Sequence, residues 1–88
     1  MSVVCILLGQ NGVVGYHQTT SDQLFLVMEG AGWVRGESPE HVPITAGQAA
    51  FWETGEWHES GTDNGMVAMI VQGDGFQFDR EMQELDRM

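Results

Sequence analysis

Glycine divides this chain into short pieces. Twelve of its 88 residues are glycine, and the segments between them are short and rich in valine, isoleucine, phenylalanine and tryptophan. Such runs separated by turn residues are typical of an all-β barrel or sandwich, here of about seven to nine strands. Candidate strands lie at residues 3–8, 13–18, 23–29, 32–36, 41–44, 48–52 and 66–72. Candidate turns lie at residues 10–12, 29–32, 38–40, 45–47 and 62–65.

The end of the chain follows a different pattern. Phe78, Met82 and Leu85 recur at helical spacing around Asp79, a residue type favoured at helix N-caps. We therefore predict a short C-terminal helix at about residues 79–87, after a barrel at about residues 3–73. The glycines never gather into a Gly/Ser-rich spacer, so residues 1–88 are expected to form a single domain.

The charge of the chain restricts its partners. Thirteen acidic residues stand against three arginines and no lysine, which gives a formal net charge of -10. Nucleic acids and anionic membranes are excluded as partners, because both require a basic surface. No apolar stretch approaches the roughly 20 residues of a membrane span, and no basic segment precedes the first apolar run. The chain has a single cysteine, Cys5, which we interpret as a small buried hydrophobic residue. A single cysteine cannot form a disulfide within the chain and fits a reducing compartment, so we expect a cytoplasmic protein.

Three of the candidate strands are apolar on both faces. They lie at residues 3–8, 23–28 and 66–71. A strand of this kind requires cover on both sides, and one short helix is too small to cover three of them. We therefore expect a homodimer in which a sheet of one copy packs on a sheet of the other.

Two sets of residues resemble the motifs of the cupin superfamily. The first cupin motif reads Gly, five residues, His-x-His, three or four residues, Glu, six residues, Gly. His17, Thr19, Gln23 and Gly30 fall into this register, with Gly12 one residue nearer to the histidine than the first glycine of the motif.

The second cupin motif reads Gly, five residues, Pro-x-Gly, two residues, His, three residues, Asn. It is matched by Gly47, Gly55 and His58, whereas Glu53 replaces the proline and Thr62 replaces the asparagine. The resemblance extends over about residues 13–71. It implies a cupin-type double-stranded β-helix, a jelly-roll barrel. Cupins commonly have more strands ahead of the first motif, which leaves open whether a partner chain contributes an N-terminal strand.

The resemblance also implies a metal site at His17, Gln23 and His58, with Thr19 as a weak fourth position. Threonine there replaces a histidine, and glutamine replaces a glutamate. Two imidazoles and one amide would form a weak site, suited to a divalent metal such as Zn, Mn, Fe, Ni or Cu. The alternative interpretation is a metal-free pocket in which both histidines are hydrogen-bonded.

Three apolar residues are expected to line the barrel beside these positions. Phe25 and Val27 share the strand face of Gln23, and Phe51 lies on a neighbouring candidate strand. They predict a small, largely apolar pocket for an unknown small molecule. Cupin enzymes include dioxygenases, isomerases and decarboxylases, so the resemblance leaves the reaction open. A metalloenzyme, a metal-free binding module and a structural dimer all remain as hypotheses.

Overall fold

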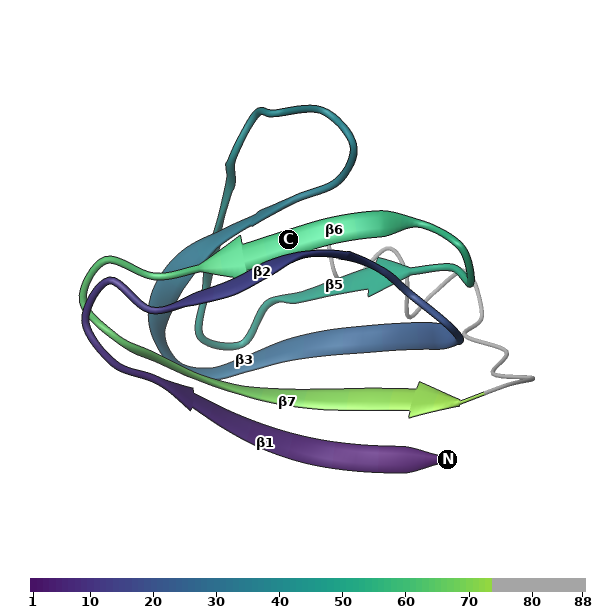
Figure 1. The fold of residues 1–88 in the computed structure, drawn as a ribbon. Helices are drawn as coiled ribbons and strands as arrows, with labels where there is room; N and C mark the ends of the chain where they lie inside the picture. The colour runs from purple at the N-terminus through teal and green to yellow at the C-terminus, as the bar shows by residue number, and fades with distance from the viewer. Residues whose placement is uncertain (74–88) are drawn as a thin grey trace.

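The computed structural model describes residues 1–73, and these form seven antiparallel β-strands (Figure 1). They are β1 (Ser2–Leu8), β2 (Val13–Gln18), β3 (Asp22–Arg35), β4 (Val42–Thr45), β5 (Ala49–Trp52), β6 (Trp57–Gly61) and β7 (Met66–Gly73). The all-β prediction is confirmed. The helix predicted at residues 79–87 lies outside the described residues. Within these residues, no helix has the length and apolar character needed to cross a membrane.

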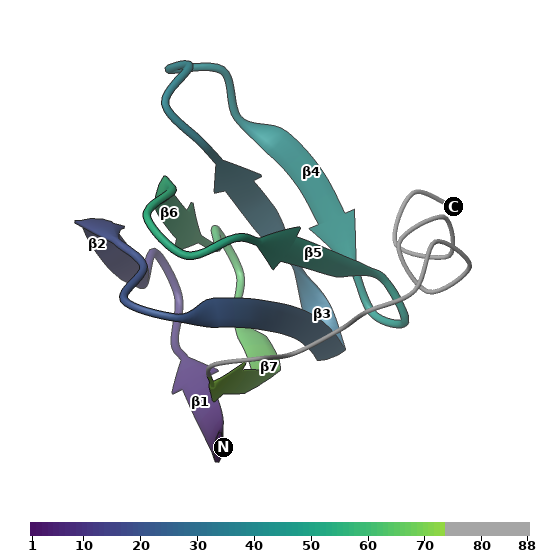
Figure 2. The ribbon, with the colours of Figure 1, turned by 90° about the vertical axis from the view of Figure 1, so that its right-hand side faces the viewer.

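The long strand β3 takes part in two sheets. Its first half pairs with β7 and β5, and β1 continues this sheet beyond β7; we call it sheet A. Its second half pairs with β4 and β6, and β2 continues that sheet beyond β6; we call it sheet B. Figure 2 shows β3 curving from one sheet into the other, so that the whole assembly curls around an interior.

The prediction of a turn at residues 29–32, between two separate strands, is wrong. The structure has one continuous strand there, because Glu29 and Gly30 pair with β7 and the next residues pair with β4. A register shift between Val27 and Glu29 marks a β-bulge, which bends a strand without ending it.

Glycine is required at two positions just after this bulge, because two other backbones approach them closely. Gly30 has a φ of 79°, and a Cβ atom added there would overlap the carbonyl oxygen of Gly65. A Cβ added at Gly32 would overlap the carbonyl oxygen of Gly61. These glycines therefore mark close backbone approach, which glycine within a strand often does.

Strand β6 is missing from the sequence prediction. Its sequence, WHESG, carries polar and small residues in place of a β-branched run. It becomes a strand because it pairs on both sides, with β2 and with β3. Tertiary pairing here outweighs a weak local preference, as is common for strands.

The core lies between the sheets and follows the alternation of β3. Gln23, Phe25 and Val27 are buried, whereas Leu24 and Leu26 on the opposite face are only partly buried. The buried apolar residues are Phe25, Val27, Val34, Ile44, Ala49, Trp52, Met66 and Ala68. The burial expected for the thiol of Cys5 is wrong, because this residue is exposed on β1.

Candidate functional site

A cavity of about 250 Å³ lies inside the barrel. Residues of β1, β2, β3, β6 and β7 line it. Its lining residues are Val4, Val14, His17, Gln23, Phe25, His58, Ser60, Ile70 and Gln72. Four of them are apolar, and the others are the two histidines, two glutamines and a serine. No Asp, Glu, Lys or Arg is among these lining residues.

The two histidines are neighbours across the strand pair β2 and β6. His17 and His58 are paired in the β-ladder, so their side chains point to the same face of sheet B. Their ring centroids are 4.4 Å apart, with an angle of 63° between the ring planes. Residues that are 41 positions apart in the sequence therefore meet edge to face at the cavity.

A backbone carbonyl orients the imidazole of His17. Its Nδ1 lies 2.7 Å from the carbonyl oxygen of Gly15. Because a carbonyl oxygen only accepts hydrogen bonds, Nδ1 carries the proton and donates it. The other ring nitrogen, Nε2, is then left with its lone pair in the neutral imidazole.

The imidazole of His58 is deeply buried and uncharged. The residue is 2% exposed, and its ring stacks on Trp52 with centroids 4.1 Å apart and planes 14° apart. Burial lowers the pKa of His58 from 6.5 to about 4, and the charge of the neighbouring His17 acts in the same direction. Its Nδ1 is buried and has no hydrogen-bond partner among residues 1–73.

Two glutamines lie side by side at the cavity. The Nε2 of Gln23 donates a hydrogen bond of 3.0 Å to the Oε1 of Gln72, its cross-strand neighbour on β7. Gln72 and Ser60 are not among the residues predicted from the sequence. The signal that could have found them is the two-residue period of a strand, since Ser60 follows His58 and Gln72 follows Ile70 at this interval.

The structure brings His17, Gln23 and His58 to the same cavity but does not bring Thr19 there. Strand β2 ends at Gln18, so Thr19 lies outside the strand and need not point to the same face as His17. The Thr19 hydroxyl is 2.8 Å from the carbonyl oxygen of Glu53 and 3.0 Å from that of Glu56. Thr19 therefore holds the 53–56 turn in place and does not line this cavity, and its assignment as a weak fourth metal-ligand position stays a prediction.

Of the three predicted pocket-lining residues, only Phe25 lines the cavity. Val27 is 1% exposed and belongs to the packed core. Phe51 is paired with Leu24, so it lies on the face of sheet A opposite to Gln23 and Phe25. Neither Val27 nor Phe51 lines this cavity. Val27 shares the strand face of Phe25 but is packed in the core. The register between β3 and β5, which is absent from the local sequence, places Phe51 on the opposite face.

No family model matches the chain, and no curated protein matches it. Solved structures do. A predicted oxalate decarboxylase from Thermotoga maritima has a TM-score of 0.72 at 22% identity, over 80% of this chain and 63% of its own. An RmlC-like cupin from Shewanella frigidimarina has a TM-score of 0.74 at 20% identity, over 80% and 62%. The cupin domain of Drosophila melanogaster CENP-C has a TM-score of 0.72 at 14% identity, over 81% and 59%.

These likenesses concern architecture. The identities are too low to carry an activity, and this chain spans less than two thirds of the length of each of the three proteins. Their backbone similarity agrees with the curled arrangement of two sheets that β3 connects. Residues 1–73 of this chain therefore have the cupin fold.

Proposed function

We propose that this chain binds a small molecule inside the barrel, against the paired imidazoles of His17 and His58. The observation that carries the proposal is that His17 and His58, whose rings meet edge to face, both line this cavity. The buried Nδ1 of His58 also lacks a hydrogen-bond partner among residues 1–73. A buried polar atom without a partner is destabilising by about 1–3 kcal/mol, and such atoms are rare in folded proteins. A ligand that turns the His58 ring enough to reach this nitrogen would recover this free energy.

The lining of the cavity indicates the chemistry of the ligand. Its volume of about 250 Å³ is smaller than the roughly 300–1,000 Å³ of pockets that hold drug-sized ligands, so the ligand is compact. Val14, Phe25 and Ile70 offer apolar contact, and the histidines and glutamines offer hydrogen bonds. Because the lining has no Asp, Glu, Lys or Arg, an uncharged molecule with an apolar body and one polar end fits best.

A divalent metal is a second candidate occupant of the same site. The hydrogen bond from His17 Nδ1 to a backbone carbonyl is the support that metal-ligating histidines usually have. The uncharged His58 and the amide of Gln23 could complete a donor set, which suits Zn, Ni or Cu better than metals that prefer carboxylates. Within residues 1–73, however, no group of three or more His, Cys, Asp or Glu side chains could hold a metal. These residues therefore fit a metal only weakly.

The names of the similar structures do not choose between these candidates. One is a predicted decarboxylase, and another is the cupin domain of CENP-C, whose name states no reaction. The same fold hosts both, so the choice depends on the residues of this cavity.

Ligand binding is expected to depend on His58. In a thermal-shift screen of small uncharged compounds, sugars and small acids, a bound compound at 100 times its Kd should stabilise the protein by about 2.7 kcal/mol. His58→Phe keeps a flat ring against Trp52 but removes the ring nitrogens, so it should abolish the shift. His41→Phe is the matched control, because His41 also stacks on a tryptophan, Trp33, with centroids 3.7 Å apart, but outside the cavity. Equal loss of the shift in both variants would contradict the proposal.

The metal candidate makes a separate prediction. Gln23→Glu places a carboxylate beside the two imidazoles, where it would attract a bound metal cation. Two opposite unit charges 4 Å apart near a protein surface attract by about 4 kcal/mol before desolvation is counted. We expect Zn binding, measured by calorimetry on protein first dialysed against a chelator, to tighten at least about tenfold, or 1.4 kcal/mol. Gln18→Glu is the control, since this exposed residue on β2 adds the same charge outside the cavity. If Gln23→Glu and Gln18→Glu bind Zn equally, the metal candidate is excluded.

A further inference from the structure

The cavity receives a pair of amide side chains from one sheet and a pair of imidazoles from the other. Gln23 and Gln72 are cross-strand partners on β3 and β7 of sheet A. His17 and His58 are cross-strand partners on β2 and β6 of sheet B. Cross-strand partners point to the same face of their sheet, so a molecule in the cavity meets both pairs.

The hydrogen bond between the two amides leaves polar atoms of both available. The Nε2 of Gln23 donates to the Oε1 of Gln72 at 3.0 Å. A glutamine amide has an acceptor oxygen and two N–H donors, so the Oε1 of Gln23 and the Nε2 of Gln72 remain. Neither of these two atoms has a hydrogen-bond partner within residues 1–73, and neither is fully buried. Both are therefore available to a ligand.

The imidazole of His17 adds a further acceptor. Its Nδ1 donates to the carbonyl oxygen of Gly15, which leaves Nε2 as an acceptor in the neutral ring. Together with the amides, the cavity thus offers two acceptors, on Gln23 and His17, and the N–H donors of Gln72. A primary carboxamide carries the complementary set, because its nitrogen has two N–H donors and its carbonyl oxygen accepts.

Other small polar groups match this set less well. A carboxylate only accepts hydrogen bonds, and it would bring a negative charge into a lining without Lys or Arg. A ketone or an ester also only accepts, so both acceptors of the cavity would stay unpaired. A site built to hydrogen-bond an N–H group rejects an analogue that lacks it, because the polar groups of the site lose their partner.

We propose that the ligand of the cavity is a small primary carboxamide, whose NH₂ group donates to Gln23 Oε1 and His17 Nε2 and whose carbonyl oxygen accepts from Gln72 Nε2. The apolar body of the ligand lies against the apolar side chains of the lining, Phe25 and Ile70 among them. This inference rests on the proposed function and extends it by naming the polar end of the ligand.

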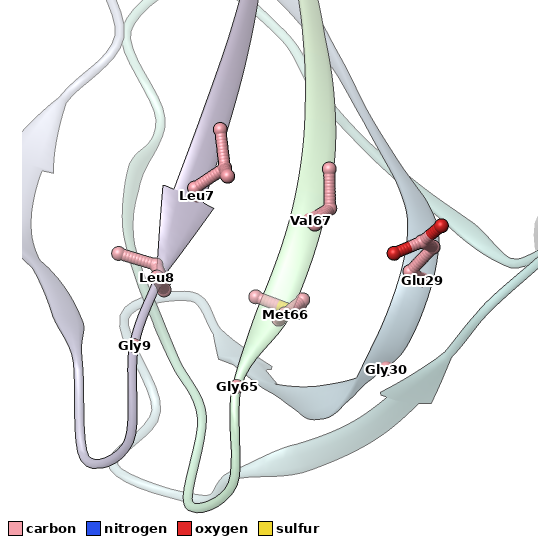
Figure 3. Close-up of a pocket in the computed structure, with 8 residues that line it drawn as sticks. All are labelled: Leu7, Leu8, Gly9, Glu29, Gly30, Gly65, Met66 and Val67. Carbon is pink, nitrogen blue, oxygen red and sulfur yellow. The ribbon is translucent and has the colours of Figure 1, made fainter.

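A second hollow is an alternative place for an apolar compound. It has a volume of about 370 Å³ and lies where β1 ends and β7 begins (Figure 3). The side chains of Leu7, Leu8, Met66 and Val67 line it, together with Glu29 and three glycines. No amide or imidazole side chain is among these lining residues. Binding in this hollow would therefore not depend on Gln23.

Matched pairs of compounds test the inference on the wild-type protein. Benzamide and the smaller isobutyramide are each compared with the methyl ketone of the same shape, acetophenone and isopropyl methyl ketone. Calorimetry should give each carboxamide that binds a Kd at least about tenfold below that of its ketone. Equal Kd values within a pair, with both compounds lost in His58→Phe, would overturn the carboxamide inference and leave the proposed function standing. Failure of both carboxamides to bind would also overturn the inference.

A variant of Gln23 tests the assigned contact. Gln23→Met keeps an unbranched side chain of similar length but removes the acceptor oxygen. It should weaken carboxamide binding at least about tenfold and leave ketone binding within about twofold. Gln10→Met is the matched control, because this exposed glutamine lies outside the cavity, and it should change neither affinity. Carboxamide binding that is unchanged in Gln23→Met would overturn the contact and would place the compound elsewhere, with the second hollow as the next site to test.

Discussion

Gly32→Ala is expected to destabilise this protein by about 3 kcal/mol or more, a large effect for the addition of a single methyl group. The added Cβ would overlap the carbonyl oxygen of Gly61 and would come within 3.0 Å of the sulfur of Met66. A carbonyl oxygen of a paired strand has little room to move, so β3 and β6 must separate. An 88-residue domain has a total stability of roughly 4–13 kcal/mol, of which this is a large share. Urea unfolding followed by circular dichroism would measure the change.

Gly9→Ala is the control for this substitution. No atom lies within 4 Å of a Cβ added at Gly9, and its φ does not lie in the left-handed region. Gly9→Ala should therefore shift stability by less than about 0.5 kcal/mol, as surface substitutions usually do. Equal stability of the two variants would mean that β3 and β6 are not held at the close approach on which the bend of β3 and the wall of the cavity depend.

The parts of the fold that could be predicted from sequence are those that local pattern determines. The apolar runs of β1 and β7 and the alternation of β2 give strands that agree with the structure to within a residue. Glycine, in contrast, has two structural uses that look alike in a sequence. It allows a turn, and it allows two backbones to touch, so the glycines at residues 30 and 32 were assigned to a turn when they lie within a bent strand.

The candidate site shows the same division. His17, Gln23 and His58, which the motif spacing selects, line one cavity, because each position is fixed relative to its own strand. Thr19 lies one residue beyond the end of β2, where the alternation of side chains along the strand no longer fixes the direction of its side chain. Gln72 is 49 residues from Gln23, and only the β3–β7 register places them together. Such pairings are set by the whole fold and are not visible in any short window.

Acid is expected to destabilise the protein through His58, because burial makes its protonation unfavourable in the folded state. The pKa of His58 is about 4 in the folded chain, compared with the ordinary value of 6.5 that applies in the unfolded chain. Above pH 6.5 the imidazole is neutral in both states and has no effect. As the pH falls below 6.5, the unfolded chain binds a proton that the folded chain does not, so stability declines until the folded pKa is reached. The loss between pH 7 and pH 5 should be about 2 kcal/mol.

Comparison of two histidine variants isolates this contribution from the titration of the many carboxylates. His58→Phe removes the group, so urea unfolding of this variant should show about 2 kcal/mol less decline between pH 7 and pH 5 than the wild type. His41→Phe removes an exposed histidine outside the cavity and should keep the full wild-type decline. An identical decline in all three proteins would show that His58 is solvated or hydrogen-bonded in the folded state. The unpartnered Nδ1 would then no longer support a ligand in the cavity, whereas a selective loss in His58→Phe would establish the neutral imidazole that the proposed ligand is expected to contact.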